Sequence, residues 1–385
     1  MKSNRIHSKP PSSVVGSGDL EHVIRTAVVS RVPREAFCTY EEPVRPPRLG
    51  DVVLVEVVEL GEDDRIEVGC PRWDDPESRG VVPFVQPVVS FATLSLAVGR
   101  RLLCAVGGRY ATDYLLAEVP DSPQEYLDLV TFGGVVGSVV SSNTRRGRVA
   151  KVRLVAFFAD SSGEILNTRS FRPRGVSAAP SALGKVRLAV VTGAAMEAGK
   201  TTAGAAFTRV VAVSGNGAWV GKVTGCGSFR DPHRLAAGRA LGTSEFMAFG
   251  YPSTHGISAE EVRALFWSVV NLLAEDARQS SGTAPWIVIE IADGLAQPQT
   301  AALLRDPTIR QATSALFYAA YDSMSARAGI HQLRDWGWEH AIVTGPVASS
   351  ALGRQEVRKL CDGDPIRFFD SLDPSAVQDT LGLKI

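Results

Sequence analysis

The hydrophobic pattern divides the chain into two parts with different periodicities. In the first part, from about residue 21 to 170, short runs rich in β-branched residues are separated by clusters of Gly, Pro, Asp and Asn. The run at 51–60 is the clearest, and similar runs lie at 80–90, 101–107, 114–119, 132–141 and 150–159. No long amphipathic helix interrupts them. This pattern predicts a small β-rich domain, either a barrel or a sandwich.

The second part alternates apolar strands with helical segments. Strands are predicted at 186–191, 219–223, 286–291, 315–320, 340–343 and 366–369. Helices are predicted at 200–213, 231–241, 259–278, 300–312, 325–336 and 350–361. Continuous apolar strands are expected where helices cover both faces of a sheet. The alternation therefore predicts an α/β fold with a three-layer, mostly parallel sheet.

Composition sets the expected boundaries between these parts. Residues 1–20 are rich in Ser, Pro and Gly and are expected to form a disordered tail. Residues 171–184 have the Pro, Gly and Ser content of a linker. The predicted organisation is therefore a tail, a β-rich domain at 21–170, the linker, and a second domain at 185–385.

A loop of small residues joins the first apolar strand of the second part to the helix at 200–213. It ends in Gly199-Lys200-Thr201, and Ala194 stands where the P-loop pattern G-x4-G-K-S/T has its first Gly. Such a strand–loop–helix directs backbone N–H groups and the positive helix end at a phosphate. Lys200 is expected to bridge the β- and γ-phosphates, and Thr201 to bind Mg²⁺. The residues predicted to bind nucleotide are Gly193, Ala194, Ala198, Gly199, Lys200, Thr201 and Thr202.

Charged residues at the ends of two further strands complete a candidate catalytic site. Glu290 follows an apolar strand, where an acidic side chain would hold the metal, and Asp293 comes shortly after it. Lys222 ends another strand, at the edge where ligands bind in open α/β sheets. There it would neutralise a transferred phosphoryl group or a substrate carboxylate, the alternative being a solvated side chain. Asp231 opens the next helix, either as its N-cap or as a second metal contact.

Three other segments carry polar or basic side chains. The Gly/Ser/Thr-rich loop at 250–256 contains His255, which would hold a substrate or transfer a proton, or else have a structural role. In the β-rich part, Arg109 and Tyr110 follow a strand and would contact a ligand or close the domain interface, the alternative being a strand-connecting turn. The basic cluster at 145–153 is interpreted as a solvated hairpin and strand edge.

These motifs and their order resemble dethiobiotin synthetase and its relatives. The resemblance lies in the segments 192–202, 220–222 and 289–290. The same class of P-loop proteins contains MinD-like and signal-recognition GTPases. The resemblance implies a site made by the P-loop Lys and Thr, a second Lys, and an Asp and a Glu on Mg²⁺. By position these residues are Lys200, Thr201, Lys222, Asp231 and Glu290.

The segments 250–256 and 222–225 are also similar to a poorly characterised P-loop family that includes proteins implicated in D-glutamate N-acylation. That similarity covers about residues 185–350 and leaves out the β-rich part, so no substrate is transferred from it. The chain departs from dethiobiotin synthetase at Ala194, and it lacks a Gly-Ala-Gly-Gly segment after Glu290.

Composition narrows the functional classes. Basic and acidic residues number 41 each, which argues against nucleic acid as a partner because phosphate contacts require a basic surface. The five cysteines contain no C-x-x-C pair, so no zinc site or disulfide framework is expected, and reduced thiols in a cytoplasmic protein fit best. No signal peptide or membrane-spanning segment is predicted. A homo-oligomer is compatible with the sequence.

Together these features predict an ATP- and Mg²⁺-dependent enzyme that acts on a small molecule, by phosphoryl transfer or by ATP-driven ligation or acyl transfer. The expected catalytic residues are Lys200, Lys222, Glu290 and His255. The expected metal ligands are Thr201, Asp231 and Glu290. Two alternatives stay open: a nucleotide-dependent switch ATPase that regulates a protein partner, and a polynucleotide kinase that contacts nucleic acid through the basic cluster. The sequence does not distinguish ATP from GTP.

Overall fold

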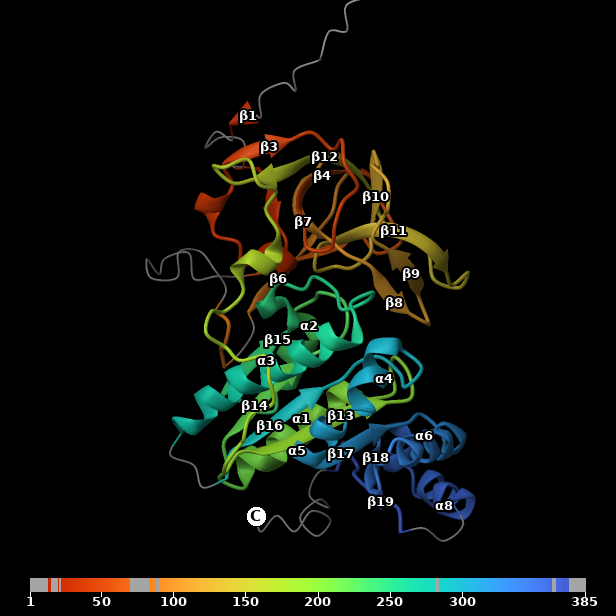
Figure 1. Ribbon diagram of the computed structural model, residues 1–385. Helices are drawn as coiled ribbons and strands as arrows, with labels where there is room; N and C mark the ends of the chain where they lie inside the picture. The colour runs from red at the N-terminus through yellow and green to blue at the C-terminus, as the bar shows by residue number, and fades with distance from the viewer. Residues whose placement is uncertain are drawn as a thin grey trace, which may run out of the picture.

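Figure 1 shows the computed structural model of the 385-residue chain, in which a β-rich region lies against an α/β region. The structure describes residues 13–14, 20, 22–69, 83–87, 90–280, 284–361 and 365–373. We call the described residues from 13 to 171 the barrel region and those from 186 to 373 the P-loop region. Most of the predicted tail at 1–20 and much of the predicted strand at 80–90 lie outside the described residues.

Most strands of the barrel region belong to one ten-stranded sheet. They are β1 (Ser13–Val14), β2 (Ile24–Arg25), β3 (Thr39–Glu41), β4 (Val52–Glu59), β7 (Arg101–Val106), β8 (Arg109–Ala111), β9 (Leu115–Glu118), β10 (Tyr126–Leu129), β11 (Val135–Ser142) and β12 (Lys151–Ala159). β5 (Arg65–Gly69) pairs with β6 (Phe91–Ser95) in a separate ribbon. Short 3-10 helices are η1 (Ala27–Val29), η2 (Arg34–Ala36) and η3 (Thr168–Phe171).

The main sheet of this region closes on itself. β10 pairs with both β11 and β12, so β12, β4, β7, β11 and β10 form a ring. The interior is filled by alternate residues of the predicted strand at 51–60, since Val53, Val55 and Val57 are all fully buried. Of the two architectures that the β-rich pattern allowed, the structure has the barrel.

The P-loop region contains a seven-stranded parallel sheet with the order β15-β14-β16-β13-β17-β18-β19. The strands are β13 (Arg187–Gly193), β14 (Ala218–Lys222), β15 (Gly242–Glu245), β16 (Trp286–Glu290), β17 (Thr313–Ala319), β18 (Ala341–Thr344) and β19 (Arg367–Phe368). The helices are α1 (Lys200–Val213), α2 (Arg230–Ala236), α3 (Ala259–Arg278), α4 (Pro298–Leu304), α5 (Pro307–Ala312), α6 (Ser323–Asp335), α7 (Pro346–Ser349), α8 (Ala351–Leu360) and the 3-10 helix η4 (Phe246–Phe249).

Both faces of this sheet are covered by helices. Along β13, Leu188 and Val190 belong to the core shared with α3 and α6, whereas Ala189 and Val191 belong to the core shared with α1 and α2. An apolar strand of this kind contributes side chains to both cores, because successive side chains point to opposite faces of the sheet. Apolar cores therefore lie on both faces of the parallel sheet. No helix in the described parts of the chain is long and apolar enough to cross a membrane.

Two predicted helices are shorter in the structure. The segment 300–312 is split into α4 and α5, because Asp306 caps a new helix whose first residue is Pro307. The helix predicted at 231–241 ends at Ala236. It is followed by the edge strand β15, which was not predicted. The sequence of β15 is Gly-Thr-Ser-Glu, which has little β-propensity, yet all its residues are buried.

The barrel region covers the side of the sheet that carries β14 and β15, with α2, β15 and α3 nearest to it (Figure 1). Gln86 forms an antiparallel bridge with Thr243 of β15. Arg169 contacts Glu261 of α3 at 2.7 Å. The polar strand β15 is therefore buried because a second region of the chain covers it.

Candidate functional site

The loop between β13 and α1 has the shape of a phosphate-binding loop. α1 begins at Lys200 directly after Gly199, whose φ of 97° lies in the left-handed region that favours glycine. The Lys200 side chain is buried, and its ammonium group donates to the Ala195 carbonyl across the loop at 2.6 Å. Burial lowers the pKa of Lys200, and the nearby Glu290 carboxylate partly offsets this. A bound phosphate would supply the negative charge that this buried cation lacks.

The second predicted lysine lies at the centre of a buried ionic cluster. Lys222 and Glu290 are direct partners in the parallel pairing of β14 and β16, so the two side chains meet at the carboxyl end of the sheet. The Lys222 Nζ is 3.2 Å from Glu290 Oε1 and donates to the Asp231 carboxylate. Burial lowers the pKa of Lys222, but the two carboxylates outweigh it and the pKa is raised overall.

Asp231 belongs to this cluster and does not cap α2. The N-cap position is occupied by Phe229, and Asp231 lies in the first turn with its carboxylate directed at Lys222. The charge of Lys222 lowers the pKa of Asp231. The predicted N-cap role is therefore wrong, and the predicted metal contact stays a prediction. Lys222, Asp231 and Glu290 were predicted from two strands and a helix. In the structure Lys222 contacts both carboxylates.

The side chains present fit a magnesium ion. No group of three or more His, Cys, Asp and Glu residues forms a metal cluster in the part of the chain that the structure describes. A P-loop Mg²⁺ does not need one, because it is held by a Thr hydroxyl, one or two carboxylates, phosphates and water. Thr201 lies in the first turn of α1. The buried Glu290 Oε2 has no hydrogen-bond partner, so an acceptor oxygen is available for a cation.

The loop after β16 brings Asp293 to the same place. A Cβ added at Gly294 would lie 2.2 Å from the Ala194 carbonyl oxygen, so this loop and the P-loop touch through backbone. Burial raises the pKa of Asp293, and Lys222, Lys200 and Arg109 act in the opposite direction. Asp293 therefore lies within the electrostatic reach of both lysines and of an arginine from the barrel region.

His255 lies at the contact between the two regions and outside the ionic cluster. Its Nε2 is 2.9 Å from Glu118 Oε1, and its ring centroid is 5.8 Å from that of Tyr110. The loop at 250–256 reaches the loop after β14 through Thr254, whose hydroxyl accepts from the Gly225 N–H at 2.9 Å. None of these contacts joins His255 to Lys222 or Glu290, so its predicted catalytic role stays a prediction.

Two side chains of the barrel region reach the site loops, a role that the sequence did not predict for either of them. Arg146, in the turn between β11 and β12, lies 3.7 Å from Glu197 of the P-loop. Glu67 on β5 is fully buried and accepts from Ser228 and Phe229 at the start of α2. The basic residues of the cluster are exposed, as the solvated interpretation predicted, and Glu67 belongs to no sequence motif. Only the contact between the two regions identifies them.

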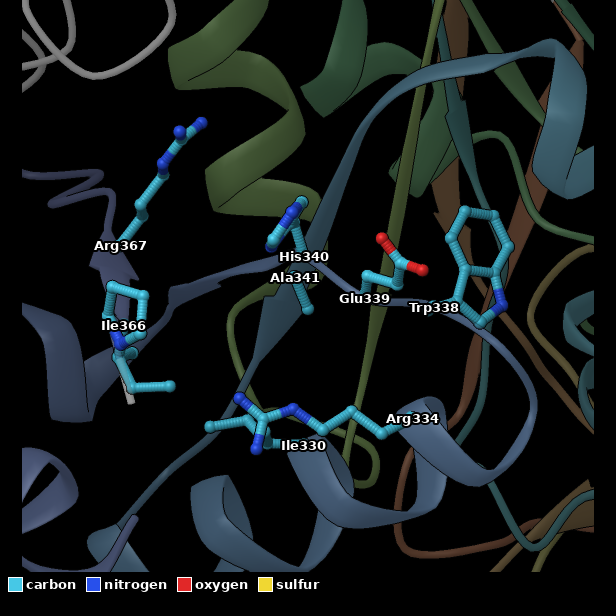
Figure 2. A pocket seen from close by; sticks show the side chains of 9 residues that line it. Ile330, Arg334, Trp338, Glu339, His340, Ala341, Ile366 and Arg367 are labelled. Atoms are coloured by element: carbon cyan, nitrogen blue, oxygen red, sulfur yellow. The ribbon is translucent and has the colours of Figure 1, made fainter. Parts of the chain in front are cut away.

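Two cavities differ in their relation to this site. One of about 850 Å³ lies between α3, α4 and α6 and includes Ala194 of the P-loop in its lining. The other, of about 310 Å³, is lined by Arg334, His340 and Arg367, as Figure 2 shows. His340 immediately precedes β18 and Arg367 begins β19, so this cavity lies at the amino ends of the strands. The smaller cavity is therefore at the opposite edge of the sheet from the P-loop.

Comparisons with known proteins found distant likenesses to solved structures. No protein-family model matches the chain, and no curated protein matches it. The signal recognition particle receptor FtsY from Elizabethkingia anophelis, solved with GDP, is similar with 13% identity over 50% of this chain and 59% of that chain, at a TM-score of 0.33. HypB from Helicobacter pylori, solved with nickel, is similar with 14% identity over 51% of this chain and 85% of that chain, at a TM-score of 0.27.

These likenesses are too distant to carry an argument about function. The chain spans about 59% of the length of FtsY. The assignment of a P-loop NTPase fold rests on this chain's own geometry: the strand β13, the loop that ends at Gly199, the helix α1 and the parallel sheet around them.

Proposed function

We propose that the chain is an ATP- and Mg²⁺-dependent enzyme that transfers a phosphoryl group to a small molecule. One observation carries the proposal: a second buried lysine, Lys222, lies beside the P-loop and is held between Asp231 and Glu290. A switch ATPase requires the P-loop lysine and the metal, whereas a second cation at the carboxyl end of a strand suits neutralisation of a transferred group. The two lysines flank Glu290, because β16 lies between β13 and β14.

The roles of the side chains follow from their positions. Lys200 and the backbone N–H groups of the P-loop bind and orient the β- and γ-phosphates. Thr201 and Glu290 hold Mg²⁺, with Asp231 as the further acidic residue, and the bound ion would neutralise charge on the phosphate oxygens. Lys222 stabilises the negative charge of the acceptor oxygen or of the phosphoryl group in transit. Catalysis by this set is mainly positioning and charge neutralisation.

The reaction proposed is transfer of the γ-phosphoryl group of ATP to an acceptor oxygen. The bond from γ-phosphorus to the bridging oxygen breaks, a bond to a carboxylate or similar oxygen forms, and ADP leaves with the electron pair. When the acceptor is a carboxylate, the product is an acyl phosphate. Attack by a second nucleophile would then complete a ligation or acyl transfer and release inorganic phosphate.

A switch ATPase is the second candidate, and one observation favours it. Arg146 contacts Glu197 of the P-loop, and Glu67 contacts the start of α2, so the loops around the nucleotide site are linked to the barrel region. A nucleotide that displaced these loops would also displace the barrel region. The polynucleotide kinase has less support, because basic and acidic residues are equal in number.

Binding of a fluorescent ATP analogue tests the nucleotide site directly. We expect Lys200→Ala to weaken binding by about tenfold or more, because a charge-assisted hydrogen bond contributes roughly 1.5–3 kcal/mol. Lys359→Ala on the exposed face of α8 is the matched control. GTP is titrated in competition, so that the same assay ranks the two nucleotides. Unchanged affinity in Lys200→Ala would remove the nucleotide site from the P-loop.

Transfer of label from γ-³²P-ATP distinguishes the candidate functions. The protein is incubated with Mg²⁺ and, in parallel, with a small-molecule extract, a protein extract and a mixture of oligonucleotides. A labelled small-molecule product, lost in Lys222→Met while ATP binding is kept, supports the proposal. Release of phosphate that only the protein extract stimulates supports the switch ATPase, and labelled oligonucleotide ends support the kinase.

A further inference from the structure

The start of α2 is held by the barrel region. Glu67 is fully buried, and its carboxylate accepts from the Ser228 hydroxyl and the Phe229 N–H, both at 2.9 Å. The Ser228 hydroxyl in turn accepts from the Arg230 N–H at 3.2 Å. The guanidinium of Arg230 lies 3.5 Å from the same Glu67 carboxylate. One carboxylate from another region therefore organises three consecutive residues.

The barrel region makes further contacts to this turn, beside the P-loop region's own hydrogen bond from the Gly227 N–H to the Pro252 carbonyl at 2.8 Å. A Cβ added at Gly133 would lie 2.1 Å from the Gly227 carbonyl oxygen, so the two backbones are in direct contact. The Arg230 guanidinium lies over the Phe132 ring at 4.9 Å. The N-cap residue Phe229 makes no side-chain capping hydrogen bond, and Ser228 accepts from the Arg230 N–H, so the Phe229 N–H is left to Glu67. Glu67 thus supplies the acceptor for both the Ser228 hydroxyl and the Phe229 N–H at this turn.

Asp231 is the next residue after this turn. Its carboxylate meets Lys222, and through Lys222 it is linked to Glu290. Leu235 and Ala236 anchor the last turn of this seven-residue helix in the core, whereas the Asp231 side chain in its first turn moves with the start of the helix. A shift of the turn at 228–230 would therefore displace the Asp231 carboxylate from the cluster.

From this geometry we propose that Glu67 is a positioning residue for the metal site, and that it makes Mg²⁺ binding at Asp231 depend on the docked barrel region. The inference rests on the proposed metal role of Asp231. Residues that orient metal ligands from outside the coordination sphere commonly change metal affinity by 10–100-fold when they are replaced. The barrel region is then part of the metal site without contacting the metal.

The test measures the Mg²⁺ dependence of nucleotide binding, which requires no acceptor. A fluorescent ATP analogue is titrated against the full-length protein without Mg²⁺, and Mg²⁺ is then titrated at a fixed analogue concentration. We expect Glu67→Ala to raise the Mg²⁺ half-saturation concentration by about tenfold, while affinity for the metal-free analogue changes by less than about threefold. Glu67→Gln keeps an acceptor oxygen and is expected to shift in the same direction by less.

The matched control is Glu261→Ala. It removes another carboxylate that pairs with an arginine across the two regions, Arg169 at 2.7 Å, and it lies on α3 away from Asp231. Its Mg²⁺ half-saturation is expected to equal that of the wild type. Thermal unfolding of each variant shows that it is folded. If Glu67→Ala does not fold, Glu67→Gln takes its place.

A double-mutant cycle with Asp231→Asn separates positioning from a general loss of stability. If Glu67 acts through Asp231, the double variant Glu67→Ala/Asp231→Asn has the same Mg²⁺ half-saturation as Asp231→Asn alone. Equal behaviour of the Glu67 and Glu261 variants, or fully additive shifts in the cycle, overturns the inference. If the Asp231→Asn variant has the same Mg²⁺ half-saturation as the wild type, the proposed metal role of Asp231 is overturned instead.

Discussion

At the scale of the residue, the neighbours of Lys222 decide its chemistry. An isolated buried lysine tends to lose its proton, because burial disfavours the charged form. Asp231 and Glu290 reverse that tendency and raise the pKa of Lys222. Lys200 shows the opposite balance, since burial outweighs Glu290 and its pKa is lowered. Two lysines at one sheet edge therefore differ, one paired with protein carboxylates and the other available to an anionic ligand.

The pH dependence of stability follows from these shifts. The pKa of Asp231 is lowered in the folded state, so its pairing with Lys222 stabilises the fold above the usual Asp range and is lost as the pH falls through it. The pKa of Lys222 is raised, so its contribution is present below the usual Lys range and is lost as the pH rises beyond it. Between about pH 5 and pH 9 the pairing is intact.

Lys222→Met tests this balance. The variant removes the direct ion-pair partner of the buried Glu290, and we expect a loss of about 3 kcal/mol in the free energy of unfolding at pH 7. Unpaired buried carboxylates take up protons more readily, so the loss should become smaller as the pH is lowered toward 4. Urea denaturation at several pH values measures this loss of unfolding free energy, with Lys359→Met as the control. A loss that stays constant over this range would contradict the assignment.

At the scale of the element, local signals decided where α4 ends and α5 begins. A hydrophobic pattern continues across 300–312, but Asp306 accepts hydrogen bonds from Thr308 at 2.8 Å and from Ile309 at 3.2 Å. Pro307 occupies the first helical position, where its missing N–H costs nothing. A cap and a proline therefore divide what hydrophobic periodicity alone indicates as one helix.

Asp306→Ala tests the importance of this cap. We expect a loss of about 1 kcal/mol in the free energy of unfolding, the usual value for removing an Asp N-cap. The Arg263 contact to Asp306 at 3.0 Å would be lost as well. Glu356→Ala on the exposed side of α8 is the control. If both variants unfold at the same urea concentration as the wild type, α5 does not depend on its cap.

At the scale of the whole molecule, the barrel region completes the α/β region. It buries the polar edge strand β15 and supplies Glu67, Arg109 and Arg146 around the site loops. Arg31 and Glu245 form an ion pair at 2.8 Å across the two regions, and both are buried. A charge in such a place is tolerated only when its partner is present.

Arg31→Met tests how strongly the two regions depend on this pair. The variant leaves Glu245 buried without its cation, and we expect a loss of about 3–5 kcal/mol in the free energy of unfolding. Adding Glu245→Gln removes the unpaired charge, so the double variant should be more stable than the single one. Urea denaturation compares them, with Arg148→Ala, which is 89% exposed, as the control. A double variant that is no more stable than Arg31→Met would contradict the expectation.

The sequence by itself determined the elements whose signals are local. The P-loop, the helix at Lys200–Val213 and the helix at Ala259–Arg278 have the predicted bounds, because periodicity, small loop residues and caps lie within a few positions of one another. Lys222 and Glu290 were also expected together, since parallel strands bring their carboxyl ends to one edge. The roles of these residues in binding and catalysis stay predictions.

Only the tertiary structure decided what depends on contacts between distant segments. The closure of the barrel needs β10 to pair on both sides, and the burial of β15 needs the barrel region to cover it. Glu67 holds the turn before Asp231 across more than 160 positions of the chain. No local pattern marks such a residue, because its importance comes from desolvation and hydrogen bonds that exist only after the two regions dock.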